Sequence, residues 1–156
     1  MRVAAHGIEI DMPRGWEARI YRRHGADPTL HAANFGLPDA DGDFGSGATA
    51  RMPHGGTFFA IKEYRPGPRL VAGAGLFASH AIPLPLHGRH FHHRALQVGR
   101  PGQLGLQHFF TTAGRPFCLY AVIKPPPAGP VVAVAAHRQA EHLSSILSSL
   151  SIKRPH

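Results

Sequence analysis

Cysteine is nearly absent from this chain. Cys118 is the only thiol in 156 residues, so no disulfide can form within the chain. A lone cysteine is typical of proteins from a reducing compartment. Long apolar runs are also missing: no segment approaches the roughly 18 residues that a membrane span requires, and the opening residues become charged before an apolar signal-peptide core is complete. The sequence therefore predicts a cytoplasmic protein without a membrane span.

Acidic residues are scarce as well. Nine aspartates and glutamates stand against 17 lysines and arginines, which gives a net charge of +8 at neutral pH. Few carboxylates disfavour hydrolases that depend on a carboxylate pair. Positive charge is typical of nucleic-acid binders, but here the basic residues are spread singly or in pairs and form no basic helix or recognition motif. A weak nucleic-acid binder remains one alternative function.

Glycine and proline, in contrast, are abundant. Their 18 and 15 residues make up about a fifth of the chain, which predicts a folded core with long ordered loops. The chain is long enough to bury a substantial apolar core and too short for two ordinary domains. Residues 1–156 are therefore expected to form a single domain.

Short runs of alternating apolar and polar residues predict β-strands. At the N-terminus, residues 3–10 and 16–22 flank a turn with proline and glycine, so we expect a hairpin over residues 3–22 with Trp16 as a core anchor. A second hairpin is expected from two later strands. The further predicted strands are residues 30–37, 57–64, 95–98, 105–112 and 117–123.

The predicted strand 117–123 has apolar residues on both faces, which is typical of a strand in the middle of a covered sheet. Cys118 lies in this strand and is expected to be a buried, unreactive thiol. The chain also lacks a Gly-x-Ser-x-Gly elbow and a phosphate-binding glycine loop. These features favour a protein that is not an enzyme.

A closing helix is predicted over about residues 131–150. Pro130 is suited to open it because its fixed φ matches the first helical turn. One apolar stripe recurs at helical spacing: Leu143, Ile146, Leu147 and Leu150. Residues 66–101 show no period, so this proline-rich excursion is expected to run over the surface. The predicted fold class is α+β: an antiparallel β-sheet with a C-terminal helix packed on one face and a loop-rich middle.

The most unusual feature is the tract from His87 to His93, which holds four histidines in seven residues. Imidazole binds metals and titrates near neutral pH, so the tract can hold a metal, sense pH or form a partly cationic loop. Its spacing matches neither a structural zinc site nor a His-Glu-x-x-His helix. The candidate metal ligands are His90, His92, His93 and His108. Zinc, copper and nickel suit them equally.

An acidic segment superficially resembles the start of a calcium loop. Asp39, Asp41 and Asp43 alternate with other residues, but the twelfth position falls on Ala50, where a calcium loop needs a bidentate glutamate. An EF-hand is therefore rejected. We expect instead a turn whose aspartates accept hydrogen bonds from their own backbone.

Both ends of the chain resemble the PsbP-like superfamily. Residues 7–16, with the turn Pro-Arg-Gly-Trp, are similar to the first hairpin of that superfamily, and residues 143–152 are similar to its final helix and Ser-Leu-x-Ile tail. The resemblance implies an antiparallel sheet flanked by helices that serves mostly as a non-catalytic accessory, assembly or partner-binding module. The proline-rich middle and the lack of a secretory or lipoprotein signal depart from the pattern, which argues against a photosynthetic or envelope role.

These observations leave three function classes. The leading one is a non-catalytic accessory module that needs no cofactor and binds another protein through its loop-rich middle. The first alternative is a transition-metal-binding protein or metalloenzyme that uses the histidine tract. The second is the weak nucleic-acid binder.

Overall fold

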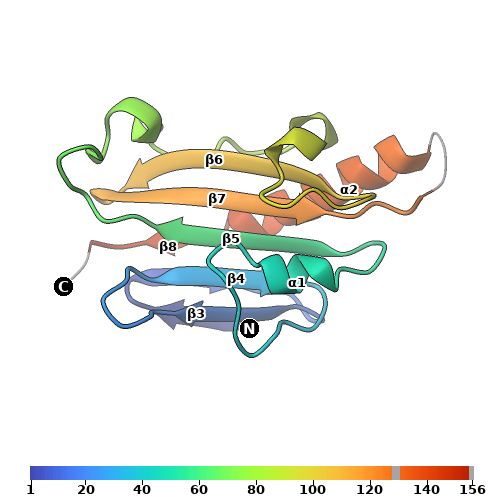
Figure 1. The fold of residues 1–156 in the computed structure, drawn as a ribbon, viewed down its shortest axis with the longest axis horizontal. Helices are drawn as coiled ribbons and strands as arrows, with labels where there is room; N and C mark the ends of the chain where they lie inside the picture. Colours follow the sequence, from blue (N-terminus) through green and yellow to red (C-terminus); the bar gives the residue numbers. More distant parts are fainter. Residues whose placement is uncertain (128–130, 155–156) are drawn as a thin grey trace.

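The computed structural model describes residues 1–127 and 131–154. Figure 1 shows how the elements are arranged. In chain order they are β1 (Arg2–Ala5), β2 (Ile8–Asp11), β3 (Glu17–Tyr21), β4 (Thr29–Ala33), α1 (Ser46–Ala50), β5 (Thr57–Glu63), the 3-10 turns η1 (Gly75–Phe77), η2 (Gly88–His90) and η3 (His93–Ala95), then β6 (Leu104–Thr112), β7 (Arg115–Ile123), α2 (Val131–Leu147) and β8 (Ser151–Ile152).

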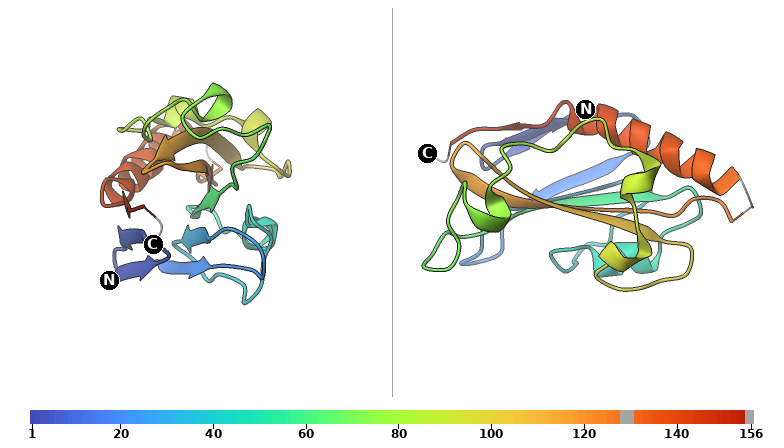
Figure 2. Two further views of the ribbon diagram at one scale, coloured as in Figure 1. Left: turned by 90° about the vertical axis from the view of Figure 1, so that its left-hand side faces the viewer. Right: turned by 90° about the horizontal axis from the view of Figure 1, so that it is seen from above.

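The strands form two sheets, and all their pairings are antiparallel. One sheet has the order β1-β2-β8 and the other the order β3-β4-β5-β7-β6. Helix α2 and the three-stranded sheet lie on the same side of the five-stranded sheet (Figure 2). The predicted α+β class, with an antiparallel sheet and a C-terminal helix on one face, is confirmed.

The main apolar core fills the space between the five-stranded sheet, α2 and β2. Trp16 is buried in it, with its ring centroid 6.1 Å from that of Phe59 on β5 and 5.8 Å from that of His142 on α2. The predicted stripe of α2 packs into the same core through Leu143, Ile146 and Leu147. Trp16 is therefore a core residue, as predicted, and it joins the sheet to the helix.

A smaller core covers part of the opposite face of the five-stranded sheet. Helix α1 and the segments around it pack there against β5 and β7, with Ala48 and Met52 contacting Phe58, Tyr120 and Val122. Strand β7 is thus covered on both sides and is buried along its whole length. This confirms the position predicted for it from its two apolar faces.

The hairpin predicted over residues 3–22 is wrong. Residues 3–10 divide into β1 and β2, which pair with each other, while β3 pairs with β4 in the other sheet. The reason is the dipeptide His6-Gly7, whose φ angles of 53° and 79° are those of the two-residue turn that suits the twist of a hairpin. The proline and glycine turn before Trp16 instead carries the chain from one sheet to the other.

Two other strand predictions differ from the structure. Strand β4 ends at Ala33. At the next residue, the Asn34 backbone N still donates to the Thr57 carbonyl, but the Thr57 backbone N donates to the Asn34 side-chain oxygen, at 2.7 Å, instead of to a backbone carbonyl. Residues 95–98 form no strand. Instead, η3 ends at Ala95, and the Gln97 backbone N donates to the Tyr120 hydroxyl at 2.8 Å.

The strands predicted over residues 57–64, 105–112 and 117–123 correspond to β5, β6 and β7 within two residues at each end. Strands β6 and β7 form the second predicted hairpin, around Ala113 and Gly114.

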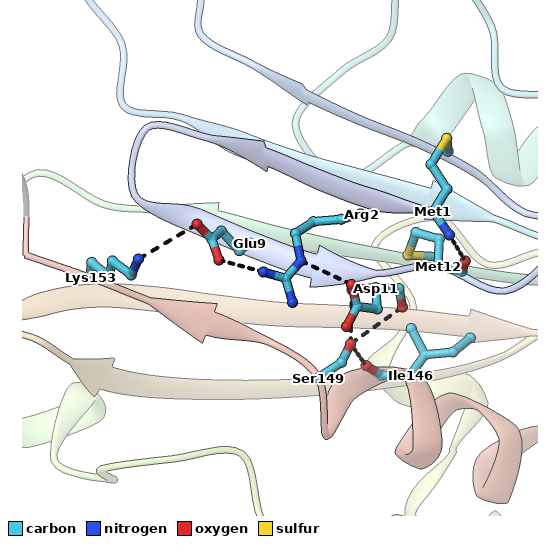
Figure 3. A network of polar contacts seen from close by, with 8 residues as sticks. All are labelled: Met1, Arg2, Glu9, Asp11, Met12, Ile146, Ser149 and Lys153. Atoms are coloured by element: carbon cyan, nitrogen blue, oxygen red, sulfur yellow. Dashed lines mark hydrogen bonds and ion pairs between the residues drawn. The ribbon is translucent and has the colours of Figure 1, made fainter.

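The end of α2 is held against the three-stranded sheet by polar contacts (Figure 3). The helix ends at Leu147 rather than near residue 150, and the Ser149 hydroxyl donates to the Ile146 carbonyl at 2.7 Å and accepts from the Asp11 backbone N at 3.0 Å. This places the following residues beside β2, where they pair as β8. The predicted helix start at Pro130 lies outside the described residues.

The excursion 66–101 contains no α-helix and no strand of either sheet, but it does not lie only on the surface. Phe77, Leu86 and Phe91 are buried. The Thr111 hydroxyl on β6 donates to the Phe77 carbonyl at 2.7 Å, and the Leu86 backbone N donates to the Ser144 hydroxyl on α2 at 2.8 Å. The excursion is therefore joined to both β6 and α2 by hydrogen bonds.

Trp16→Ala is expected to destabilise the protein by about 3 to 5 kcal/mol, because it removes a buried side chain that contacts both Phe59 on β5 and His142 on α2. Leu147→Ala is expected to cost about 2 to 5 kcal/mol for the same reason. His92→Ala, at an exposed side chain, is the control and is expected to be nearly neutral. Urea denaturation midpoints of the three variants test this, and a Trp16→Ala protein as stable as the control would contradict the core described above.

Glu63→Gln is expected to cost about 3 to 5 kcal/mol, since it leaves the buried guanidinium of Arg115 without its counter-charge. The two side chains form a bidentate pair at 2.6 and 3.0 Å, and the Arg115 side chain is 4% exposed. Replacing both residues by methionine is expected to cost less than Glu63→Gln alone. Equilibrium unfolding of the single and double variants tests this, and a single variant close to wild type would disprove the role of the pair.

Candidate partner-binding surface

The four histidines predicted as metal ligands do not lie together. His92 and His93 have exposed side chains, and the backbone of His92 bridges to Gly105. His108, on β6, has its Nε2 3.2 Å from the Ser79 hydroxyl and 3.1 Å from the Ala81 carbonyl. Within residues 1–127 and 131–154, no three His, Cys, Asp or Glu side chains are arranged to hold a metal ion. Metal binding by the tract stays a prediction.

The first part of the histidine tract is docked on α2 instead. The His87 ring stacks on the His137 ring with centroids 5.6 Å apart, and His137 Nε2 lies 2.7 Å from a carboxylate oxygen of Glu141. A Cβ at Gly88 would lie only 2.9 Å from the His137 backbone N. Sequence reasoning missed His137 and Glu141, although their i, i+4 spacing on a predicted helix was a usable signal.

His90 packs beside His87, and its pKa is lowered. Its Nδ1 accepts a hydrogen bond from the His87 backbone N at 3.0 Å, and its ring lies edge-on to the His87 ring with centroids 5.3 Å apart. Desolvation lowers the pKa of His90, and the positive Arg89 lowers it further. This half of the tract therefore acts as a packing element against α2.

Gly88→Ala is expected to loosen the tract from α2, because the added methyl group meets helix backbone that cannot move aside. We expect a loss of about 1 to 3 kcal/mol, the usual cost of overpacking. Gly99→Ala is the matched control, since a Cβ there meets nothing within 4 Å. Thermal unfolding compares the two, and hydrogen exchange over residues 86–90 is expected to rise only in Gly88→Ala. Equal unfolding temperatures and equal exchange rates in the two variants would show that the close approach of Gly88 to α2 does not stabilise the protein.

Two other candidate groups have structural roles. Cys118 is buried, and its burial raises the pKa of the thiol to about 12, so it is not a reactive nucleophile at neutral pH. Asp41 accepts hydrogen bonds from the backbone N atoms of Gly42, Gly47 and Ala48 at 2.8 to 2.9 Å. This is the backbone-bonded acidic turn that was expected, and it fixes the start of α1.

A hollow of about 420 Å³ lies between the excursion and the end of the five-stranded sheet. We call it the aromatic groove. Its lining consists of Tyr64, Arg69, Leu70, Val71, Ala74, Gly75, Leu76, Phe77 and Phe109. Tyr64 follows β5, Phe77 lies in η1 and Phe109 lies on β6, so the groove depends on three separate segments that the sheet brings together.

Aromatic side chains form the floor of the groove. The ring centroid of Phe77 lies 5.5 Å from that of Tyr64 and 5.4 Å from that of Phe109. Val71 and Leu76 also line the groove, and their side chains are 60% and 65% exposed. The groove thus combines packed aromatic rings with apolar side chains that water still reaches.

The electrostatics of the aromatic groove are positive. Arg69 is the only charged residue among its described lining residues. The Lys62 ammonium lies 5.2 Å from the centroid of the Tyr64 ring, and it is paired with the Asp43 carboxylate at 3.0 Å. Burial raises the pKa of Tyr64 to about 12, so its hydroxyl stays protonated at neutral pH. The groove offers cation and hydroxyl donors around an apolar floor and contains no nucleophile with an adjacent base.

No family model, curated protein or solved structure matches this chain. The PsbP-like resemblance therefore stays a prediction. In the part of the chain that the structure describes, no helix combines the length and the apolar character needed to cross a membrane.

Proposed function

We propose that this protein is a non-catalytic accessory module that binds a partner protein through the aromatic groove. One observation carries the proposal. Of the six large apolar side chains that are exposed in the described part of the chain, four belong to the excursion 66–101: Val71, Leu76, Leu84 and Val98. Val71 and Leu76 line the aromatic groove, whereas Leu84 and Val98 line other hollows. Exposed apolar side chains beside packed aromatic rings are typical of an interaction surface.

The groove is suited to binding because much of it is held in place before a partner arrives. The Gly73 backbone N donates to the Thr111 hydroxyl at 2.9 Å, and Gly67 and Leu70 exchange backbone hydrogen bonds at 2.9 and 3.2 Å. Segments that are already fixed lose less conformational entropy on binding. An accessory role of this kind is also what the PsbP-like resemblance of the chain ends implies.

The partner segment that fits this groove is apolar with acidic flanks. Its apolar residues would cover Val71, Leu76 and the aromatic floor, while its carboxylates would lie near Arg69 and in the positive field of the chain, whose net charge is +8. Opposite charges speed association and select against wrong partners. Cofactors have no part in this function.

The test is site-specific photo-crosslinking from position 76, followed by binding measurements with the protein that is captured. We expect capture of one stoichiometric partner from position 76 but not from position 134, where Val134 is similarly apolar and 52% exposed on α2. Leu76→Asp is expected to weaken binding of the purified partner by at least about tenfold, or 1.4 kcal/mol. Val134→Asp is the matched control and is expected to bind like wild type.

Two outcomes would reject this function. Equal losses in Leu76→Asp and Val134→Asp would show that the groove is not the binding surface. Capture of nucleic acid alone, with affinity that falls steeply as salt rises, would favour the nucleic-acid alternative.

A further inference from the structure

A second hollow lies at the β3 edge of the five-stranded sheet, away from the residues of the aromatic groove. Its volume is about 210 Å³, below the roughly 300 to 1,000 Å³ of sites for drug-sized molecules. Arg19 and Tyr21 line it from β3, and His31 lies opposite Arg19 in the register of β4. Segment 37–41 forms its other wall.

Arg19 is positioned by this segment without being neutralised by it. One guanidinium nitrogen donates to the carbonyls of Pro38 and Asp39 at 2.8 and 3.1 Å. Among the described residues, Arg19 has no carboxylate within ion-pair distance. A fixed guanidinium with N–H groups left over is the arrangement that recognises carboxylate or phosphate.

Tyr21 supplies a second donor because of the way His31 is bonded. His31 Nε2 lies 2.8 Å from the Asp43 carbonyl and 3.1 Å from the Tyr21 hydroxyl. A carbonyl only accepts, so Nε2 carries the hydrogen and the Tyr21 hydroxyl cannot donate to it. The hydrogen bond from this hydroxyl to the Gly42 carbonyl is 3.5 Å long, which is too long for a good O–H bond. The hydroxyl hydrogen is therefore available to a ligand.

Burial keeps both rings in the required state. The residue His31 is 4% exposed, and desolvation lowers its pKa, so the imidazole is neutral at physiological pH. Desolvation also raises the pKa of Tyr21 to about 12, so the hydroxyl keeps its hydrogen.

Two of the nearby carboxylates are already engaged. The carboxylate of Asp41 is occupied by three backbone N–H groups at the start of α1. That of Asp43 lies between Arg23 and Lys62, at 3.1 and 3.0 Å. Of the remaining lining residues, Leu37, Pro38 and Ala40 are apolar, and Asp39 is an exposed acidic residue whose backbone carbonyl accepts a hydrogen bond from Arg19.

We propose that this hollow binds a small organic anion, a carboxylate or phosphate group on a short apolar body. Arg19 pairs with the anionic group, Tyr21 donates its hydroxyl hydrogen to the same group, and the apolar wall formed by Leu37, Pro38 and Ala40 covers the body. The site is independent of partner binding at the aromatic groove.

The test is an NMR titration of the ¹⁵N-labelled full chain with benzoate and, separately, with inorganic phosphate. Benzoate is expected to shift the amide signals of residues 37–43 saturably, and more tightly than phosphate, because only benzoate contacts the apolar wall. Arg19→Gln is expected to weaken benzoate binding at least about tenfold and Tyr21→Phe about fivefold, the scale of one lost charge-assisted or neutral hydrogen bond. Arg51→Gln, at an exposed arginine outside the hollow, is the control for general positive charge.

Any of three results would overturn the proposal: no saturable shift up to about 10 mM benzoate, where even weak sites are occupied; equal weakening by Arg51→Gln; or phosphate binding as tight as benzoate. Amide spectra of the variants without ligand show whether each one is folded. Arg19→Lys, which keeps the charge and loses the fork of donors, is expected to fall between wild type and Arg19→Gln.

Discussion

Burial of β7 on both of its faces is the constraint on which the rest of the structure depends. Phe117, Leu119, Ala121 and Ile123 pack into the core shared with α2 and β2, while Tyr120 and Val122 pack toward α1. A strand with two apolar faces is stable only if each face is covered. Helix α2 and the three-stranded sheet cover one side, and α1 with its flanking segments covers part of the other. The molecule is layered for this reason.

The aromatic groove and the β3-edge hollow both follow from the incomplete cover on the second face. In the sheet register, Tyr21 of β3, Lys62 of β5, Cys118 of β7 and Phe109 of β6 stand in one cross-strand row. Side chains in such a row share one face of the sheet. Helix α1 packs against the neighbouring part of this face. The two ends of the row, Tyr21 and Phe109, are therefore left to line the two hollows.

The histidine tract illustrates how far composition can mislead. Four histidines in seven residues suggested a metal site, but the two halves of the tract have different surroundings in the fold. His87 packs on α2 and His90 packs on His87, while His92 and His93 lie at an exposed turn beside β6. The cause is Gly88, the residue that lets the chain approach the helix backbone within contact distance. Nothing in the local pattern shows which helix a surface segment will meet.

Local pattern was sufficient to predict most elements and the face that each one buries. The β6–β7 hairpin, strand β5, the apolar stripe of α2 and the burial of Trp16 and Cys118 were all predictable, because alternation and helical spacing report which face of an element is buried. The N-terminal hairpin was mispredicted because apolar alternation runs through His6-Gly7 without a break. The left-handed φ angles of that turn, rather than hydrophobicity, decide the pairing.

Contacts between segments that are far apart in the chain were decided only by the tertiary structure. The pairing of β2 with β8, the bond between Arg115 and Glu63, and the meeting of Tyr64, Phe77 and Phe109 join residues up to about 140 positions apart. Closing such long loops costs entropy that no local pattern reveals. The sequence by itself determined which surfaces had to be buried, since apolar periodicity is a local property. The structure determined which of them met, and so where the two hollows lie.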